Sequence, residues 1–254
     1  MKKTDCTVKT LKKSLKVLDC FIDNKGEPLG ITDIATELKL NKSNVHDILY
    51  TFEQMGYLEK DPATSKYVLS FKMLEFGYAV NQHLGYARCM YDILQELSHA
   101  VNQIVYFSVP RGTELLFLYS VYPHIEQHDF PYRSVSGEKC PLYCSSMGKA
   151  MLAFSPPELM EKMKSVEFEP RSPYTITNYE DLEKDIEKVR ERGYALDLGE
   201  SKYETGAVGV PIFDSRNVLV GAISICGALA TIRSNHKEYS EKLKEAAFKI
   251  RIRI

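Results

Sequence analysis

The chain has 254 residues, of which 44% are hydrophobic and 26% are charged, and its formal net charge is −1. This length suffices for a small domain and a larger one, each with its own core. No apolar run is long enough to span a membrane, and the N-terminus lacks the apolar stretch of a secretory signal. The six cysteines are scattered rather than spaced as a disulfide framework. We therefore expect a cytoplasmic protein without membrane attachment.

Lysine dominates the N-terminal end of the chain, where the first sixteen residues hold six lysines and a single acidic residue, Asp5. Apolar residues recur among these lysines at three- and four-residue steps from Val8 to Ile22, which predicts an amphipathic helix. The turn-forming residues 24–28 end it. The basic face of this helix either approaches phosphate or is only solvated, and the residues that follow must decide.

Two more helices and a hairpin are expected next. A short apolar stripe predicts a second helix over residues 31–38, and a third helix begins at Lys42 with Asn41 as its N-cap. Residues 57–60 and 66–69 predict two short strands around a turn. Three helices followed by a hairpin, with a tight turn before the third helix, are typical of a winged helix-turn-helix. The same pattern also occurs in modules that bind proteins.

The polar face of the third helix favours DNA, because it carries short donors near its N-terminal end. We expect DNA contacts from the following residues of that helix and of the wing: Lys42, Ser43, Asn44, His46, Asp47, Tyr50, Thr51 and Lys66. No arginine precedes Arg88, so a bidentate arginine contact to guanine is not available to this domain. We predict an operator rich in A·T, with Asn44 on an adenine edge and Lys42 on a phosphate or a guanine.

The rest of the chain predicts a linker and a second domain. A winged helix-turn-helix over residues 1–70 is followed by a linker helix over 71–85, interrupted at Gly77 and Gly85, and by a domain over 86–254. Periodicity in the last part predicts a helix over 86–101, strands 104–109 and 115–121 joined by 110–113, helices 145–153 and 179–192, strands 194–197, 206–213 and 218–225, and a helix from His236. This order predicts an α+β sensor domain with a mixed, largely antiparallel sheet.

Three segments of this domain carry a resemblance to a known family. They are residues 142–153 around Gly148-Lys149-Ala150, residues 222–227, and a spaced signature of Gly193, Asp197, Glu200, Ala207, Val208, Gly209, Ile212, Phe213 and Asp214. With the winged helix in front, the chain resembles the IclR family of bacterial transcription regulators over nearly its full length. The resemblance implies a GAF-like effector domain, a homodimer that often pairs into a tetramer, and operator binding modulated by a small organic molecule, with repression as the commoner outcome.

The resemblance also points to effector-binding residues. In relatives whose ligand is a small carboxylate, the pocket is built from these three segments, which by position indicates Ser146, Met147, Asp197, Ala207, Ser224 and Cys226. A turn before a helix at 147–149 offers amides to an anion, and Ser224 adds a hydroxyl donor. The alternative is that these residues only cap the helix and pack. Lys149 is interpreted as a structural charge or a dimer contact. Some relatives carry a cysteine in place of Ala207, and many an arginine in place of Asp47, so ligand and operator stay open.

The sequence leaves three alternatives to a DNA-binding regulator: an enzyme, a zinc-binding protein and a sensor without DNA binding. Cys140 or Cys144 with His124 or His128 supplies a nucleophile and a base, but no third catalytic partner accompanies them. The same two pairs, each four residues apart, have a spacing that zinc ligands use. We expect no enzyme activity, no cofactor and no metal. A ligand- or partner-binding sensor that has lost DNA binding is the alternative, supported by Asp47 and by the missing arginines.

Overall fold

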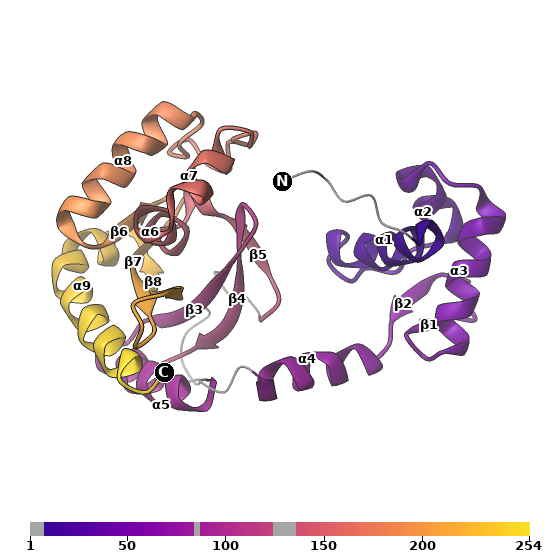
Figure 1. The fold of residues 1–254 in the computed structure, drawn as a ribbon, viewed down its shortest axis with the longest axis horizontal. Coiled ribbons are helices and arrows are strands. Elements are labelled where there is room, and N and C mark those ends of the chain that lie inside the picture. The colour runs from indigo at the N-terminus through magenta and orange to yellow at the C-terminus, as the bar shows by residue number, and fades with distance from the viewer. Residues whose placement is uncertain (1–7, 84–86, 124–135) are drawn as a thin grey trace. The chain divides into compact units, whose positions relative to one another are not determined.

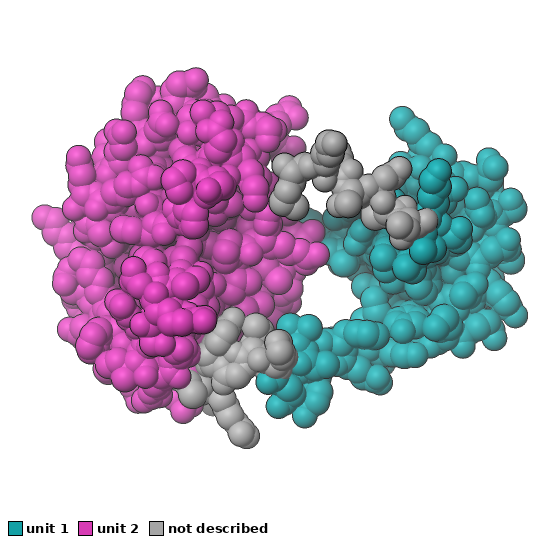
Figure 2. Space-filling view, viewed as in Figure 1, with its two compact units in different colours: residues 1–85 teal, residues 86–254 magenta. Residues whose placement is uncertain are grey.

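The computed structural model describes residues 8–83, 87–123 and 136–254 of the chain (Figure 1). Contacts between residues group the chain into two compact units, residues 1–85 and residues 86–254 (Figure 2). Each unit has its own buried core and is described by itself. Within the described ranges, no helix combines the length and the apolar character needed to cross a membrane.

The first unit consists of helices and a small hairpin. Its elements are α1 (Lys9–Asp23), α2 (Ile31–Leu38), α3 (Lys42–Gln54), β1 (Leu58–Lys60), β2 (Tyr67–Leu69) and α4 (Lys72–His83). Strands β1 and β2 pair antiparallel. The apolar stripes of the first three helices meet the hairpin in one buried cluster that includes Phe21, Leu49 and Tyr67. The order and the pairing confirm the predicted winged helix-turn-helix.

Two local predictions need correction in this unit. Asn41 is the N-cap of α3, as predicted, but its side chain makes no capping hydrogen bond. Gly77 does not interrupt α4, which continues through it to His83, because one glycine costs a helix only about 1 kcal/mol. Gly85, the second predicted break, lies outside the described residues. At the start of α2, the backbone amide of the N-cap residue Gly30 donates to Asp33 Oδ2 at 2.9 Å.

The second unit is a layered α+β domain. Its elements are α5 (Ala87–Val101), β3 (Ile104–Arg111), β4 (Glu114–Val121), β5 (Lys139–Pro141), a 3₁₀ turn η1 (Leu142–Cys144), α6 (Ser146–Phe154), α7 (Pro157–Met163), α8 (Tyr179–Arg192), β6 (Ala195–Leu198), β7 (Thr205–Phe213), β8 (Leu219–Ala228) and α9 (Leu229–Arg251). The strands form one six-stranded sheet in the order β5-β4-β3-β8-β7-β6. Figure 1 shows helices on both faces of this sheet.

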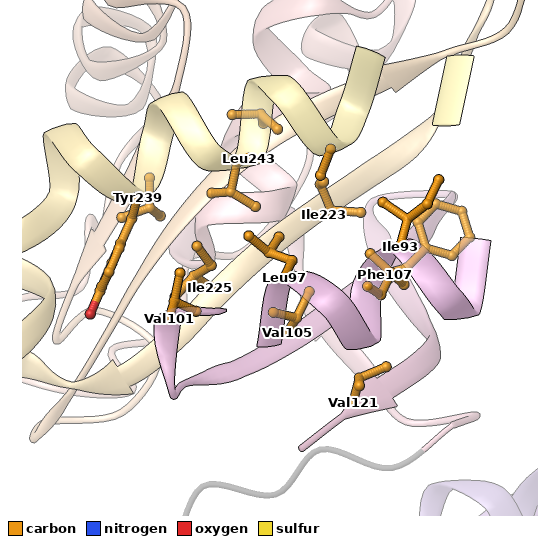
Figure 3. Close-up of a cluster of buried hydrophobic side chains, with 14 of the residues drawn as sticks. Ile93, Leu97, Val101, Val105, Phe107, Val121, Ile223, Ile225, Tyr239 and Leu243 are labelled. Atoms are coloured by element: carbon orange, nitrogen blue, oxygen red, sulfur yellow. The ribbon is translucent and has the colours of Figure 1, made fainter. Parts of the chain in front are cut away.

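Strict alternation along the strands explains why both faces are covered. In β3, Val105 and Phe107 join a cluster with α5 and α9, whereas Ile104 and Tyr106 join a cluster with α6, α7 and α8. Successive strand side chains point to opposite faces, so a strand that is apolar at every position must be buried on both. Figure 3 shows the first cluster, in which Leu97 of α5 and Leu243 of α9 lie over the sheet.

The α+β fold is confirmed, with three differences in detail. All pairings between the described strands of the sheet are antiparallel, so they contain none of the parallel pairs that a mixed sheet has. Helix α9 begins at Leu229 rather than at His236, and its apolar first turn packs Ile232 against Gly206 of β7. The sequence reasoning also missed α7, which begins with Pro157 at its first position.

Candidate functional site

A pocket of about 90 Å³ lies in the second unit beside the N-terminal end of α6. Its walls come from β3, β4, β5, β6, β7 and β8 and from the loops that precede α8 and follow β6. Sixteen residues line it: Tyr106, Phe117, Glu138, Lys139, Cys140, Ser145, Ser146, Met147, Arg171, Asp197, Ser201, Lys202, Thr205, Ala207, Ser224 and Cys226. All six residues expected at an effector site are among them. The structure brings these six residues together in one cavity. Their role in binding an effector stays a prediction.

Strand register explains why residues distant in sequence share this wall. Asp197 of β6 pairs with Ala207 of β7, which in turn pairs with Cys226 of β8. In the next row of the same face, Ser224 of β8 pairs with Tyr106 of β3. Directly paired residues of antiparallel strands point to the same face of a sheet. The two rows therefore present a carboxylate, a hydroxyl and a thiol to the α6 side of the sheet.

Glycines bring the end of α6 close to this wall. A Cβ atom on Gly209 of β7 would lie 2.7 Å from the carbonyl carbon of Ser146 and 2.9 Å from the amide nitrogen of Met147, closer than real Cβ atoms come. A Cβ on Gly148 would overlap the backbone of Leu142. Only glycine permits both approaches. Close backbone packing therefore explains Gly148 and Gly209, which belong to two of the three segments that resemble the family.

The first turn of α6 offers backbone donors to the pocket. Ser145 is the N-cap, and its Oγ accepts a hydrogen bond from the Gly148 amide at 3.0 Å. The amides of Ser146 and Met147 belong to the part of a helix that has no intrahelical acceptors, where the helix dipole also favours negative charge. We expected a turn immediately before a helix at residues 147–149. The turn is η1, which ends at Cys144, and Met147 is already the second residue of α6. This geometry suits an anionic group.

Asp197 is buried and already hydrogen-bonded by its own loop. Its Oδ1 accepts from the backbone amides of Glu200 and Ser201 at 2.7 and 3.4 Å, and its Oδ2 accepts from the Ser201 hydroxyl at 2.5 Å. Burial raises the pKa of this carboxyl above its ordinary value despite these donors. Asp197 thus organises the loop that follows β6 as well as lining the pocket.

Lys149 lies one turn into α6 and forms ion pairs within the domain. This agrees with its interpretation as a structural charge. Its Nζ lies 2.6 Å from Glu200 Oε1 and 2.8 Å from Asp185 Oδ2, and its side chain is 1% exposed. These two carboxylates raise the pKa of Lys149 and keep it charged, although burial opposes them. Burial raises the pKa of Glu200 to about 7, and no described residue bonds its Oε2. The cluster joins α6 and α8 to the pocket loop.

The rim of the pocket carries charges that the sequence reasoning did not single out. Lys139 follows the undescribed residues 124–135, Arg171 precedes α8, and Lys202 follows Asp197 in the loop. None of the three makes an ion pair with a carboxylate of the described residues. Family motifs could not have indicated Arg171 or Lys139, which lie outside the three segments. Lys202 lies between Glu200 and Ala207 of the signature. Of these three residues, it is the one that the family motifs could have indicated.

The third helix presents its predicted DNA-facing residues to solvent. All seven candidates on α3 are exposed, as is Lys66, which immediately precedes the wing strand β2. His46 Nδ1 lies 3.2 Å from Asp47 Oδ1, and the His46 ring stacks on Tyr50 with centroids 6.3 Å apart. Asn44, Asp47 and Thr51 line a groove between α3 and α1. The polar face of the helix is therefore free for recognition, with Asn44 at its α1 side.

The residues that supported zinc or catalysis are only partly described. His124 and His128 lie outside the described residues. Cys140 and Cys144 are free thiols. Among the residues that the structure describes, no group of three or more histidine, cysteine or carboxylate side chains is placed to hold a metal ion.

Comparison with known proteins follows the same division of the chain. The IclR helix-turn-helix domain matches residues 10–62, and the bacterial transcriptional regulator IclR C-terminal domain matches residues 78–252. The HTH-type transcriptional regulator KipR of Bacillus subtilis is 29% identical over 244 residues, covering 95% of each chain. XynR of Escherichia coli is 26% identical over 94% of each chain.

Solved structures agree with these sequence matches. The Thermotoga maritima IclR structure has 32% identity and a TM-score of 0.71, covering 96% of this chain and 98% of that chain. An IclR homologue from Microbacterium hydrocarbonoxydans, complexed with 4-hydroxybenzoate, has 22% identity and a TM-score of 0.77 over 96% and 98% of the two chains. The second likeness shows the fold alone. With both domain models matched in order, the chain belongs to the IclR family of bacterial transcriptional regulators, with a helix-turn-helix DNA-binding domain and an IclR effector domain.

Proposed function

We propose that this regulator is a cytoplasmic repressor whose operator binding is modulated by a small organic carboxylate. The observation that carries the proposal is the pocket at the end of α6, which is lined by Ser146 and Met147, the first two residues of that helix, and by Ser224. An anion there gains from helix-terminal donors and from the nearby basic rim. The homologue crystallised with 4-hydroxybenzoate binds a carboxylate, which supports this ligand class.

Size and surface composition narrow the ligand class further. A cavity of about 90 Å³ is small beside the several hundred Å³ of pockets for drug-sized ligands. Tyr106, Phe117 and Met147 give it apolar surface, while Arg171 and Lys202 make its opening basic. A metabolite with one carboxylate and a short apolar or hydroxylated body matches this combination.

Thermal-shift screening of small carboxylates tests the effector site, because a compound that binds only the folded state raises its stability. For a carboxylate that raises the melting temperature, Ser224→Ala should increase Kd by about tenfold or more, since a hydrogen bond to a charged group contributes about 1.5–3 kcal/mol. Ser240→Ala is the matched control, because Ser240 is also buried but lies on α9 and bonds to Lys237. Equal loss of affinity in both variants would remove Ser224 from the site.

Operator binding is proposed to use α3 in the major groove and the wing beside it. In this proposal Lys42 and Lys66 contact phosphate, Ser43, Asn44, His46, Tyr50 and Thr51 read base edges, and Asp47 limits affinity by its negative charge. A double-stranded operator read by two such helices requires a homodimer, or a tetramer made of two dimers. Large exposed apolar side chains support self-association: Phe71, just before α4, is 82% exposed, Leu74 of α4 is 68% exposed and Leu11 of α1 is 55% exposed.

Substitutions on α3 test DNA binding directly. Asp47→Asn should tighten binding to the DNA upstream of the regulator's own gene by a few-fold, because it removes repulsion from phosphate. Lys42→Ala should weaken binding and reduce the salt slope by about one, since one phosphate contact releases about one counterion. Lys188→Ala, an exposed lysine on α8, should change neither. Binding without any salt dependence, or no binding at low salt, would favour the alternative of a sensor that has lost DNA recognition.

A further inference from the structure

Two surface loops meet at the rim of the pocket, and each carries one of its basic residues. The first loop, residues 171–175, lies before α8 and contains Arg171. The second loop, residues 199–204, joins β6 to β7 and contains Lys202. Both side chains line the pocket, although their loops are distant in sequence. The position of each cation therefore depends on how the two loops are held together.

Buried hydroxyl groups join the backbones of the two loops. Thr175 is buried, and its Oγ1 donates to the carbonyl oxygen of Glu200 at 2.6 Å. The same Oγ1 accepts from the backbone amide of Arg171 at 3.0 Å. Ser172 Oγ donates to the carbonyl oxygen of Gly199 at 2.5 Å. The backbone of one basic residue is thus bonded, through a single hydroxyl, to the loop that carries the other.

An aromatic pair joins the same two loops on the solvent side. The rings of Tyr174 and Tyr203, one from each loop, stack with centroids 5.8 Å apart and planes 6° apart. Gly199 has a positive φ of 92°, and a Cβ atom there would lie 3.1 Å from Tyr174 Cδ2 and 2.9 Å from the Tyr203 carbonyl oxygen. Glycine suits both this conformation and this close approach. The 199–204 loop is thus shaped to bring its tyrosine onto the other loop.

The two tyrosines contribute little to the buried core, because Tyr174 is 52% exposed and Tyr203 is 55% exposed. A stacked aromatic pair favours its own geometry by about two- to tenfold in an equilibrium constant, beyond the effect of the area that it buries. An interaction of this size does not decide whether the domain folds. It is large enough to change how often two surface loops open locally.

We propose that Tyr174 and Tyr203 are positioning residues of the pocket, which hold the two loops together so that Arg171 and Lys202 face one bound anion. A ligand that enters preformed loops does not have to order them, so its binding costs less. Neither tyrosine lines the pocket, and the pair acts on affinity through the two cations. The nature of the ligand rests on the proposed function, whereas the joining of the loops does not.

Hydrogen exchange of the unliganded, full-length protein tests the joining of the loops without any effector. The amides of Glu200 and Ser201 donate to Asp197 and report on the 199–204 loop, and mass spectrometry of peptides follows them. Tyr203→Ala should raise their exchange rate by about two- to tenfold. Tyr203→Phe keeps a ring and should exchange at the wild-type rate. Tyr91→Ala, at an exposed tyrosine of α5, is the control and should change nothing in this loop.

A double variant separates one shared contact from two independent ones. If the stack is the contact that matters, Tyr174→Ala combined with Tyr203→Ala should exchange no more than about twofold faster than either single variant. Wild-type exchange in both single variants would overturn the proposal, as would effects that multiply in the double variant.

Lactate and lactamide test the consequence for binding, because they share a short hydroxylated body and only lactate is charged. Calorimetry should show that Tyr203→Ala raises the Kd of lactate by about two- to tenfold, and that Tyr203→Phe keeps the wild-type Kd. In a protein that already carries Arg171→Gln and Lys202→Gln, Tyr203→Ala should have little further effect, because the groups that it positions are gone. A general loss of structure would weaken binding in that background as well.

The outcomes distinguish the positioning role from the proposed function. A Kd of lactate that Tyr203→Ala leaves unchanged, or raises equally without the two cations, would overturn the positioning role. Failure of lactate to bind the wild-type protein, or equal binding of lactamide, would instead contradict the proposed carboxylate ligand. Hydrogen exchange would then still decide whether the two tyrosines hold the loops together.

Discussion

Replacing Lys149 by methionine is expected to lower the free energy of unfolding by about 3–5 kcal/mol, because it leaves two carboxylates without their counter-charge. Lys149 Nζ lies 2.6 Å from Glu200 and 2.8 Å from Asp185, and the side chains of these carboxylates are only 11% and 21% exposed. Urea unfolding followed by circular dichroism measures the loss. Lys184→Met is the matched control: Lys184 pairs with Asp181 at 3.1 Å, but both side chains are more than half exposed, so the change should stay within about 0.5 kcal/mol.

The pH dependence of this variant has a definite sign. Glu200 has a folded-state pKa of about 7, above its ordinary value of 4.5. Stability from this group is therefore complete below pH 4.5 and is lost as pH rises through 7. Without the Lys149 ammonium, which holds this pKa down, the loss of stability should continue to higher pH, so Lys149→Met should be less damaging at pH 5.5 than at pH 8. Glu200→Gln in the same background should flatten the difference. A deficit equal at both pH values would show that lost packing, not charge, explains it.

Much of the fold could be predicted from sequence because most of its helices and strands have a clear local sequence pattern. Helix α2 and the start of α3 follow from apolar stripes with a glycine and an asparagine ahead of them. The hairpin of β3 and β4 follows from two apolar runs joined by the turn at residues 110–113. The residues at which elements begin and end were harder to predict. The first turn of α9 is as apolar as the strand before it, so only the packing of Ile232 on Gly206 marks the change.

The pocket was predictable only where family segments line it. Ser146, Asp197 and Ser224 meet because strand register and the approach of α6 bring three segments together. Arg171 and Cys140 join them through loops and an edge strand, whose positions are set by contacts far away in sequence.

Gly209→Ala is expected to lower the free energy of unfolding by about 1–3 kcal/mol, the usual cost of overpacking a close contact. The added methyl would lie 2.7 Å from the Ser146 carbonyl and 2.9 Å from the Met147 amide. The backbone there cannot rotate away as a flexible side chain can, so β7 and α6 must separate. Gly77→Ala provides a control of opposite sign. Nothing lies within 4 Å of a Cβ at Gly77 in α4, so this variant should gain about 0.5–1 kcal/mol from helix propensity.

The same variant links packing to ligand binding. Separation of α6 from β7 displaces the Ser146 and Met147 amides, the proposed anion donors, from the row that holds Ser224. Gly209→Ala should therefore weaken binding of a carboxylate found by thermal shift by at least about tenfold, while binding to operator DNA in the absence of that carboxylate stays near wild type. Isothermal calorimetry and DNA titration measure the two properties. Unchanged carboxylate affinity in a destabilised Gly209→Ala protein would place the anion away from the α6 terminus, and the search for its donors would then move to Arg171 and Lys202 at the rim.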